Sequence, residues 1–378
     1  MKRDDPHAML REAVRRFARE RLWPNAARWD RECHFPREEL REAAAMGLFG
    51  VAVPEEWNGA GMDYTALAIA CEEISAGDGA TGTILSVNNL VAGILNGFGN
   101  AEQKKRWLAP LARGEMLGAF ALTEPHAGSD ASAILTRARR DGSDYVLNGV
   151  KQFITSGKTA DVCVVFAVTG KGAGKKGISA FVVPTKTPGY VVARIEEKTG
   201  QHASDTAQIV FENCGVPAAN LLAAEGDGYR IALANLESGR INIAAQATGI
   251  ARAALGAAIG YAKERKSFGQ ALISHQAVNF RLADMATQIE AARQLYLYAA
   301  RLRDAGEPCL REASMAKLFA SEMAEKVCSD AIQVHGGYGY VADFPVERLW
   351  RDVRVCKIYE GASDIQRLLI GRSLDAAA

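Results

Sequence analysis

At the centre of the chain lies Val162-Cys-Val-Val-Phe-Ala-Val168, a run of β-branched and aromatic residues of strand length. Similar runs surround it at 145–147, 178–183 and 207–211, and such runs separated by turn residues predict strands. We interpret Asn148-Gly149, between Val146-Leu147 and Val150, as the turn of a hairpin. Because no alternating βαβ pattern is present, residues 119–227 are predicted to form an antiparallel β domain.

Helical periodicity flanks this domain on both sides. Residues 1–118 repeat apolar positions at helical spacing, and the charged run 11–21 is interpreted as a solvated helix face. From residue 228 onward, long segments with few breakers predict helices at 228–264, 275–304 and 309–335. The predicted class is therefore α+β, with an N-terminal helical domain (1–118), the β domain (119–227) and a C-terminal four-helix bundle (228–378).

Composition excludes several classes of function. The 378 residues carry 45 Lys and Arg against 44 Asp and Glu, so the net charge of +1 gives no bulk attraction to nucleic acid or to an anionic membrane. The seven cysteines form no CxxC pair, which argues against a disulfide framework or a zinc site and favours a reducing cytoplasm. The N-terminus runs into a charged helix and does not resemble a signal peptide.

One segment, 241–261, has the length of a membrane span. Its only charged residue, Arg252, lies near the middle, where an arginine is costly in a bilayer. The many alanines and glycines favour a buried helix that packs closely against its neighbours, and we expect no membrane span.

Near the C-terminus, Val355-Cys-Lys-Ile-Tyr-Glu-Gly-Ala-Ser-Asp-Ile-Gln-Arg367 places Glu360 after an apolar and an aromatic residue and before Gly361. A carboxylate in apolar surroundings loses hydration, so its pKa rises and it becomes a better base near neutral pH. Taken alone, the segment is equally typical of a helix-terminal Glu followed by a capping glycine.

Four further motifs each have an ordinary structural interpretation when taken alone. In Ala121-Leu-Thr-Glu-Pro-His-Ala-Gly-Ser-Asp130, the hydroxyls and glycine fit a loop that binds a heterocycle or phosphate. In Phe153-Ile-Thr-Ser156, the spacing alone favours core packing. Arg265-Lys-Ser-Phe-Gly-Gln270 suits a helix C-terminus or a pyrophosphate clamp, and His335-Gly-Gly-Tyr-Gly-Tyr340 follows a helix rather than a strand. No metal-binding histidine pair and no Ser-His-Asp set is found in the sequence.

Together and in this order, these motifs resemble the acyl-CoA dehydrogenase family of flavoproteins, over residues from about 8 to 373. The resemblance implies that the chain uses FAD to convert a saturated acyl-CoA to the trans-2-enoyl-CoA and passes electrons to electron-transfer flavoprotein. It makes Glu360 the base for the α-proton while the β-hydrogen leaves as hydride, and it assigns the Glu360 amide to the thioester oxygen. It also implies a homotetramer, a dimer of dimers whose FAD is shared between neighbouring subunits.

The resemblance extends to residues at matching positions. The expected FAD contacts are Leu122, Thr123, Phe153 and Thr155 around the isoalloxazine, and Arg265, Ser267, Phe268, Gln276, Gln333, Gly336 and Gly337 around the pyrophosphate and adenosine from a neighbouring subunit. The expected substrate contacts are Ser129, Glu237, Arg240, Tyr359 and Gly361.

The chain departs from the family pattern in three places. Ala362 stands where Thr or Ser is common, and His126 replaces a small residue. Gly239 occupies the position where isovaleryl-type members carry their base, which favours Glu360 for that role.

The motifs look most like those of short-chain and short branched-chain members, including the isobutyryl type. Two alternatives remain: an oxygen-using acyl-CoA oxidase-like flavoenzyme, which would release hydrogen peroxide under air, and a catalytically silent acyl-CoA-binding scaffold, which would not bind FAD.

Overall fold

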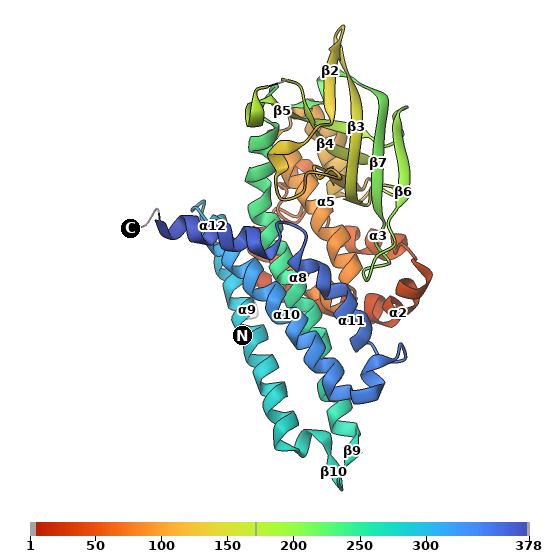
Figure 1. Cartoon of the computed structure of the whole chain (residues 1–378), viewed down its shortest axis with the longest axis vertical. Helices are drawn as coiled ribbons and strands as arrows, with labels where there is room; N and C mark the ends of the chain where they lie inside the picture. Colours follow the sequence, from red (N-terminus) through yellow and green to blue (C-terminus); the bar gives the residue numbers. More distant parts are fainter. Residues whose placement is uncertain (1–4, 171, 376–378) are drawn as a thin grey trace.

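The computed structural model describes residues 5–170 and 172–375 and confirms the order of a helical part, a β part and a second helical part (Figure 1). In the N-terminal part, π-helical turns at Ala18–Leu22 and Lys104–Leu108 join neighbouring helices. Its helices are α1 (Pro6–Phe17), α2 (Trp23–Glu32), α3 (Arg37–Ala45), α4 (Tyr64–Gly77), α5 (Gly79–Phe98), α6 (Ala101–Gln103) and α7 (Ala109–Ala112).

The central part is an eight-stranded sheet in the order β6-β7-β3-β2-β4-β5-β8, with β1 paired to β4. Most neighbours are antiparallel, as predicted, but β1 and β4 run parallel, and so does the single pair that joins β2 to β4. The strands are β1 (Gly118–Ala121), β2 (Arg137–Asp141), β3 (Asp144–Thr155), β4 (Val162–Val168), β5 (Ile178–Pro184), β6 (Tyr190–Ile195), β7 (Thr206–Val216) and β8 (Leu221–Leu222).

The hairpin predicted at Asn148-Gly149 is wrong. Strand β3 runs through both residues, and its pairing with β7 shifts register there, which is a bulge. Gly149 is needed for a different reason, because a Cβ atom at this position would lie 2.5 Å from the Thr136 hydroxyl oxygen. The hairpin turn between β2 and β3 lies instead at Gly142 and Ser143, directly after Asp141.

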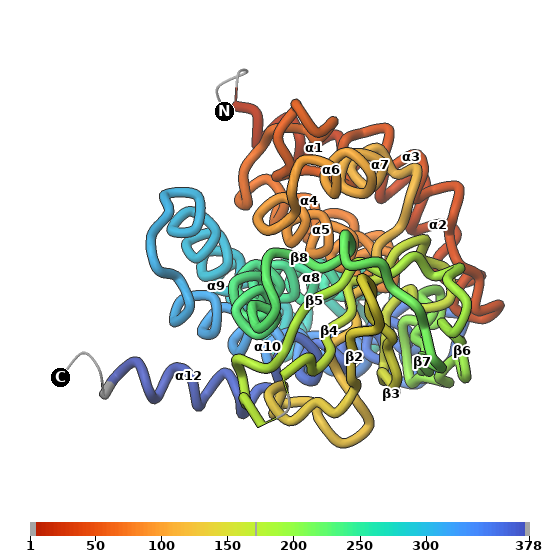
Figure 2. Tube along the Cα trace, turned by 90° about the horizontal axis from the view of Figure 1, so that it is seen from above, coloured from red at the N-terminus to blue at the C-terminus, as the bar shows by residue number. Residues whose placement is uncertain are grey.

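The C-terminal part contains long helices where the sequence predicted them. Helix α8 (Gly228–Glu264) lies in the middle of the molecule, between α5 on one side and α10 on the other (Figure 2). Helices α8, α9 (Gln276–Asp304) and α10 (Leu310–His335) pack on one another, while α11 (Val346–Val353) and α12 (Ser363–Asp375) pack against α10. A small hairpin, β9 (Lys266–Ser267) with β10 (Gln270–Ala271), joins α8 to α9.

Helix α8 alone in the described chain has the length and apolar composition of a membrane span, and most of its apolar window is buried inside the protein. Arg252, in this segment, donates to the Glu73 carboxylate at 2.5 Å and lies 3.1 Å from the Glu72 carboxylate. The helix is therefore the core helix of this fold, as its alanines and glycines predicted.

The interpretation of the run 11–21 as a solvated face is wrong in part. Arg11 and Arg15 of α1 bind the buried carboxylate of Glu73, at 3.2 and 2.9 Å. Arg11 and Arg15 lie between solvent and the buried pair Glu72 and Glu73, which belongs to α4.

Candidate active site

Glu360 lies in the short connection between a 3₁₀ turn (Arg354–Lys357) and α12. Both Glu360 (φ 51°) and Gly361 (φ 89°) have left-handed backbone conformations. Glycine adopts this conformation at little cost, but glutamate does not, so the backbone at Glu360 must be held by its surroundings. Strained residues of this kind cluster at functional sites.

The Glu360 carboxylate lies against Gly239 of α8. A Cβ atom added at Gly239 would be 2.5 Å from Glu360 Oε2, so only glycine leaves room for the carboxylate. Oε2 is buried without a hydrogen-bond partner in the described structure, and the same is true of Arg240 Nε on the next residue of α8. Unpartnered buried polar atoms are rare in proteins and need an explanation, which a bound ligand supplies.

Burial raises the pKa of Glu360 above its ordinary value, and the positive charges of Arg240 and Lys317 offset this only in part. Burial likewise lowers the pKa of the Arg240 guanidinium, against the opposing charges of Glu360 and Glu237. The arrangement is a desolvated carboxylate that faces two cations without forming an ion pair with either in the described structure, and this suits a base that accepts a proton near neutral pH.

Tyr359 points its hydroxyl away from Glu360 into a buried polar network. The hydroxyl donates to Gln246 Oε1 at 2.5 Å and lies 3.3 Å from the Thr83 hydroxyl, and Gln201 Nε2 lies 3.5 Å away. These partners come from α8, α5 and the loop after β6, so Tyr359 ties the Glu360 segment to all three parts of the fold. Since the hydroxyl is hydrogen-bonded within the protein, the predicted contact between Tyr359 and substrate concerns only the ring, and it stays a prediction.

The other predicted substrate residues on α8 lie close to this centre. Glu237 Oε2 is 3.4 Å from Arg303 and 3.6 Å from the Cys309 sulfur, and Arg240 is only 5% exposed. Beside them is a small cavity of about 10 Å³ between α4, α5, α8 and the segment at Ala52 and Val53. Its lining residues are Ala52, Val53, Tyr64, Leu67, Asn89, Leu90, Gly93, Ser238 and Asn242.

The two segments predicted to face the flavin lie side by side. The Gln152 amide in β3 donates to the Thr123 carbonyl at 2.9 Å, which places the 122–123 loop next to Phe153 and Thr155. Phe153 is 62% exposed and has a positive φ of 60°, so the expectation of core packing from spacing alone is wrong. An exposed aromatic ring held in this conformation beside a threonine fits contact with a planar ligand such as the isoalloxazine.

Sequence reasoning missed the ion pair that organises this loop. Lys151 is fully buried, and its amine donates to Glu124 Oε1 at 2.7 Å and to the Leu122 carbonyl at 3.0 Å. Glu124 in turn accepts from the Leu135 and Thr136 amides. Burial lowers the pKa of Lys151 to about 8, although Glu124 raises it in part. Glu124 lies in one quoted motif and Lys151 lies two residues before another, but only the folded chain brings them together.

The remaining predicted FAD residues lie at the opposite end of α8. At 1.5 Å per residue, Arg265 is about 40 Å along the helix axis from Gly239. Figure 1 shows this end, with β9 and β10, at the far tip from the sheet. Phe268 there is 97% exposed. Except for the half-buried Ser267, the group is exposed: Arg265, Phe268, Gln276, Gln333, Gly336 and Gly337.

Ser129 is exposed in the loop after β1, two residues before a 3₁₀ turn at Ala131–Ala133. In the same loop, His126 Nε2 bonds the Ala133 carbonyl at 3.2 Å, so this departure from the family pattern closes the loop locally. Ala362 follows Gly361 directly, and its carbonyl accepts from the Ile365 and Gln366 amides in the first turn of α12.

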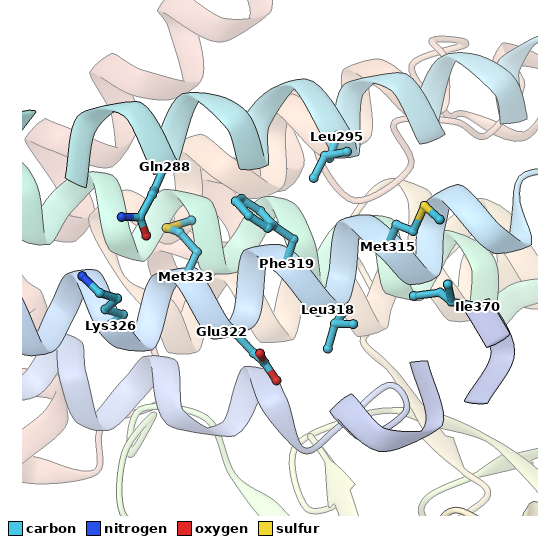
Figure 3. Close-up of a pocket in the computed structure, with 9 residues that line it drawn as sticks. All are labelled: Gln288, Leu295, Met315, Leu318, Phe319, Glu322, Met323, Lys326 and Ile370. Atoms are coloured by element: carbon cyan, nitrogen blue, oxygen red, sulfur yellow. The ribbon is translucent and has the colours of Figure 1, made fainter. Parts of the chain in front are cut away.

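A larger groove than the small cavity at Ser238 lies elsewhere in the described structure. It has a volume of about 690 Å³ and lies between α9 and α10, with Ile370 of α12 at one end (Figure 3). Its lining is mostly apolar and includes none of the predicted site residues: Gln288, Leu295, Met315, Leu318, Phe319, Glu322, Met323, Lys326 and Ile370.

Comparison with known proteins agrees with this geometry. Family models match along nearly the whole chain: acyl-CoA dehydrogenase N-terminal domain at 4–115, middle domain at 119–214 and C-terminal domain at 226–374. The rat mitochondrial short-chain specific acyl-CoA dehydrogenase is 48% identical over 371 residues, covering 98% of this chain and 90% of the relative.

Solved structures give the same result. Butyryl-CoA dehydrogenase from Megasphaera elsdenii is 40% identical with a TM-score of 0.96, covering 98% of each chain. A chain in the structure described as electron transferring flavoprotein of Acidaminococcus fermentans is 46% identical with a TM-score of 0.96, covering 97% of each chain. The chain therefore belongs to the acyl-CoA dehydrogenase family of FAD-dependent oxidoreductases.

Proposed function

We propose that this enzyme dehydrogenates a short-chain or short branched-chain acyl-CoA to the trans-2-enoyl-CoA, with Glu360 as the base that removes the α-proton. The observation that carries the proposal is the buried, unpartnered Oε2 of Glu360 against Gly239. A carboxylate left without a partner in the protein is ready to accept a proton from a bound ligand, and its raised pKa makes that transfer more favourable.

The backbone at Glu360 supports a second role. As the α-proton leaves, negative charge develops on the thioester oxygen and needs a hydrogen-bond donor. Among the described residues, the Glu360 N–H makes no hydrogen bond to a backbone or side-chain acceptor. We infer that this amide donates to the thioester oxygen, so that one residue supplies both the base and an oxyanion donor.

Little free space lies beside the base, which favours a short acyl chain over a long one. A cavity of about 10 Å³, enough for about one water-sized group, lies beside Asn242, one helical turn from Gly239 on α8. Leu67 and Leu90 are among the side chains that line it. The printed names of the rat relative and the Megasphaera structure, short-chain specific and butyryl-CoA, support the same interpretation.

FAD, when bound, supplies the acceptor for the hydride that leaves the β-carbon. Thr123 and Thr155 would hold the edges of its ring, and the exposed Phe153 would contact it. Gln152 and Lys151 keep these segments together through the Thr123 and Leu122 carbonyls. The similarity to a chain in an electron transferring flavoprotein structure supports a protein of that kind as electron acceptor.

The separation of the predicted FAD residues supports a shared cofactor. The group around Arg265 lies about 40 Å along α8 from Gly239, too far to serve the same flavin as Thr123 in one chain. We infer that it serves a neighbouring subunit in a homotetramer. The apolar groove between α9 and α10 is a surface suited to such a neighbour (Figure 3). The enzyme is proposed to work in the cytoplasm.

The test is an anaerobic titration of the yellow protein with butyryl-, isobutyryl-, 2-methylbutyryl-, isovaleryl- and octanoyl-CoA. We expect the flavin absorbance to bleach with the four-carbon chains and to respond least to octanoyl-CoA. Glu360→Gln should keep FAD and lose bleaching. Glu325→Gln, which changes a carboxylate that pairs with Arg354 and Lys357, is the matched control and should bleach normally.

Other results would contradict the proposal at defined points. Bleaching by Glu360→Gln at the normal rate would exclude this residue as the base. Preferential reduction by octanoyl-CoA would leave the activity intact and make the chain-length assignment wrong. Rapid hydrogen peroxide release under air would favour the oxidase, and a protein that cannot be loaded with FAD would favour the silent scaffold.

A further inference from the structure

Side chains from two helices donate hydrogen bonds to the backbone at Glu360 and Gly361. Lys317 Nζ, from α10, donates to the Gly361 carbonyl at 2.7 Å. Gln366 Nε2, from the first turns of α12, donates to the same carbonyl at 2.8 Å and to the Glu360 carbonyl at 3.3 Å. Two consecutive carbonyls are thus fixed at the two residues whose φ angles are positive.

The room for this arrangement comes from Gly361. A Cβ atom at this position would collide with the Gln366 side-chain amide, so a side chain here would displace the donor even if the backbone tolerated it. Gly361 therefore serves both the left-handed backbone conformation and the close approach of Gln366. The glycine at position 361 is therefore explained by the contact with Gln366 as well as by access for a ligand.

Lys317 is unusual for a residue that serves stability alone. Its side chain is fully buried, and its amine makes no ion pair with a carboxylate in the described part of the chain. Burial lowers the pKa of Lys317 to about 8, although Cys356 and Glu360 raise it in part. Since an apolar residue of similar size would usually stabilise such a position at least as well, the amine needs a role beyond folding.

We propose that Lys317 and Gln366 are positioning residues that hold the Glu360–Gly361 backbone in its left-handed form and so aim the carboxylate and the amide of Glu360 at the substrate. This inference rests on the proposed function of Glu360. Each side chain holds the Gly361 carbonyl from a different helix, so either one alone retains part of the geometry. Lys317 also places a positive charge near the base.

Charged groups on the elements around Glu360 affect the pKa of its carboxylate. Arg240 from α8 and Lys317 from α10 face the Glu360 carboxylate; Glu237 faces Arg240, and Cys356 and Glu322 face Lys317. Loss of the Lys317 cation removes one of the two groups that lower the pKa of Glu360. The pH at which the base becomes active should therefore move upward in Lys317→Met and stay unchanged in Gln366→Leu.

The test compares Lys317→Met, Gln366→Leu and the double variant with wild type, using butyryl-CoA. Each single variant should lower kcat about 10-fold with a smaller change in KM, as for loss of one charge-assisted or neutral hydrogen bond. In the double variant no side chain holds the Gly361 carbonyl. Its kcat should therefore fall by more than the product of the two single losses, to about 100-fold below that of either single variant. Hydrogen exchange in the peptide around 358–363 should speed up in the same order.

Lys357→Met is the matched control. It removes a nearby positive charge, but the Lys357 amine bonds Glu325 at 2.8 Å instead of the Glu360 segment. It should keep wild-type kcat, pH profile and hydrogen exchange. Lys317→Met should unfold at the same temperature as wild type or higher, since it replaces a buried amine that forms no ion pair by a side chain of similar length, and Gln366 still donates to the Gly361 carbonyl.

A wild-type kcat in the double variant, or an equal loss in Lys357→Met, would overturn the positioning role. So would a loss of rate in Lys317→Met that tracks only a loss of FAD or of folded protein, with no change in the pH profile. If no acyl-CoA reduces the flavin of the wild type, the proposed function is wrong. Unchanged hydrogen exchange in the variants would separately show that Lys317 and Gln366 do not fix the Glu360–Gly361 backbone.

Discussion

Glu72 and Glu360 are two carboxylates that lie against α8, and their surroundings have opposite effects on their pKa values. At the interface between α1, α4, α8 and α9, the buried Glu72 accepts from Arg293 at 2.8 Å and from the Tyr296 hydroxyl. Burial alone would raise the pKa of Glu72, but Arg293 and Arg252 outweigh it, so the pKa lies below its ordinary value. At Glu360, burial outweighs the two nearby cations and the pKa lies above its ordinary value.

The comparison shows that burial by itself does not mark a catalytic acid or base. Glu72 is buried more completely than Glu360, yet its oxygens are hydrogen-bonded and it holds the N-terminal helices to the C-terminal ones. Glu360 keeps one oxygen buried and unpartnered. Between Glu72 and Glu360, the difference that favours the proposed role of Glu360 is the missing partner, because the protein then leaves that interaction to a ligand.

The largest expected effect is on turnover at Glu360. Glu360→Gln keeps the shape of the side chain but removes the base, and we expect the rate of flavin reduction by butyryl-CoA to fall about 10²- to 10⁴-fold. Stopped-flow absorbance measures this rate. A fall of less than about 10-fold would mean that Glu360, like Glu72, is a structural carboxylate and not a base.

Glu72→Gln should show the reverse pattern. It removes a charged hydrogen-bond acceptor of Arg293 while Arg293 keeps Glu290 and Arg252 keeps Glu73, so the free energy of unfolding should fall by about 1.5–3 kcal/mol. Folded, FAD-loaded enzyme should turn over at the normal rate. Denaturant unfolding and steady-state kinetics on the same preparation give both values. Normal stability combined with slow turnover would contradict the structural role of this cluster.

A smaller effect is expected from Gly239→Ala. The added methyl would meet Glu360 Oε2 and displace the carboxylate, so kcat should fall about 10- to 100-fold. Gly256→Ala, on the same helix, is the control, because a Cβ atom there meets nothing within 4 Å. It should keep activity and gain about 0.5–1 kcal/mol of stability from the better helix former. Equal kinetics in the two variants would show that the carboxylate does not depend on this space.

The smallest effect is on the pH dependence of stability, where the two carboxylates act with opposite sign. The folded pKa of Glu360 is raised above 4.5, so its contribution to stability is complete below that pH and is lost as the pH rises through the folded value. The folded pKa of Glu72 is lowered, so its contribution is present above 4.5 and is lost as the pH falls through the folded value.

Melting temperatures of wild type, Glu360→Gln and Glu72→Gln across the acid and neutral range measure these terms. With rising pH, Glu360→Gln should gain relative to wild type through the region above pH 4.5. Glu72→Gln should approach wild type only on acidification below that pH. Parallel curves for all three proteins would mean that neither carboxylate has a perturbed pKa.

Much of the fold could be predicted because its helices are long and its breakers are strong. The segments 228–264, 275–304 and 309–335 differ from α8, α9 and α10 by a residue at most, since Gly306 and Pro308 end one run and start the next. The hairpin at Asn148-Gly149 failed because a glycine can also serve a bulge. The close contact of Gly149 with Thr136, the residue just before β2, distinguishes the two uses, and the local sequence does not contain that contact.

For the site, the sequence alone determined the motifs, their order and, through the resemblance to the family, the carboxylate that we propose as the base. Only the tertiary structure decided how that carboxylate is held: Gly239 beneath it, Lys317 and Gln366 on the carbonyls beside it, and Oε2 without a partner. The physical reason is that a residue's type and neighbours in sequence follow from the chain itself. Desolvation, missing partners and close approach depend on segments that meet only when the chain has folded.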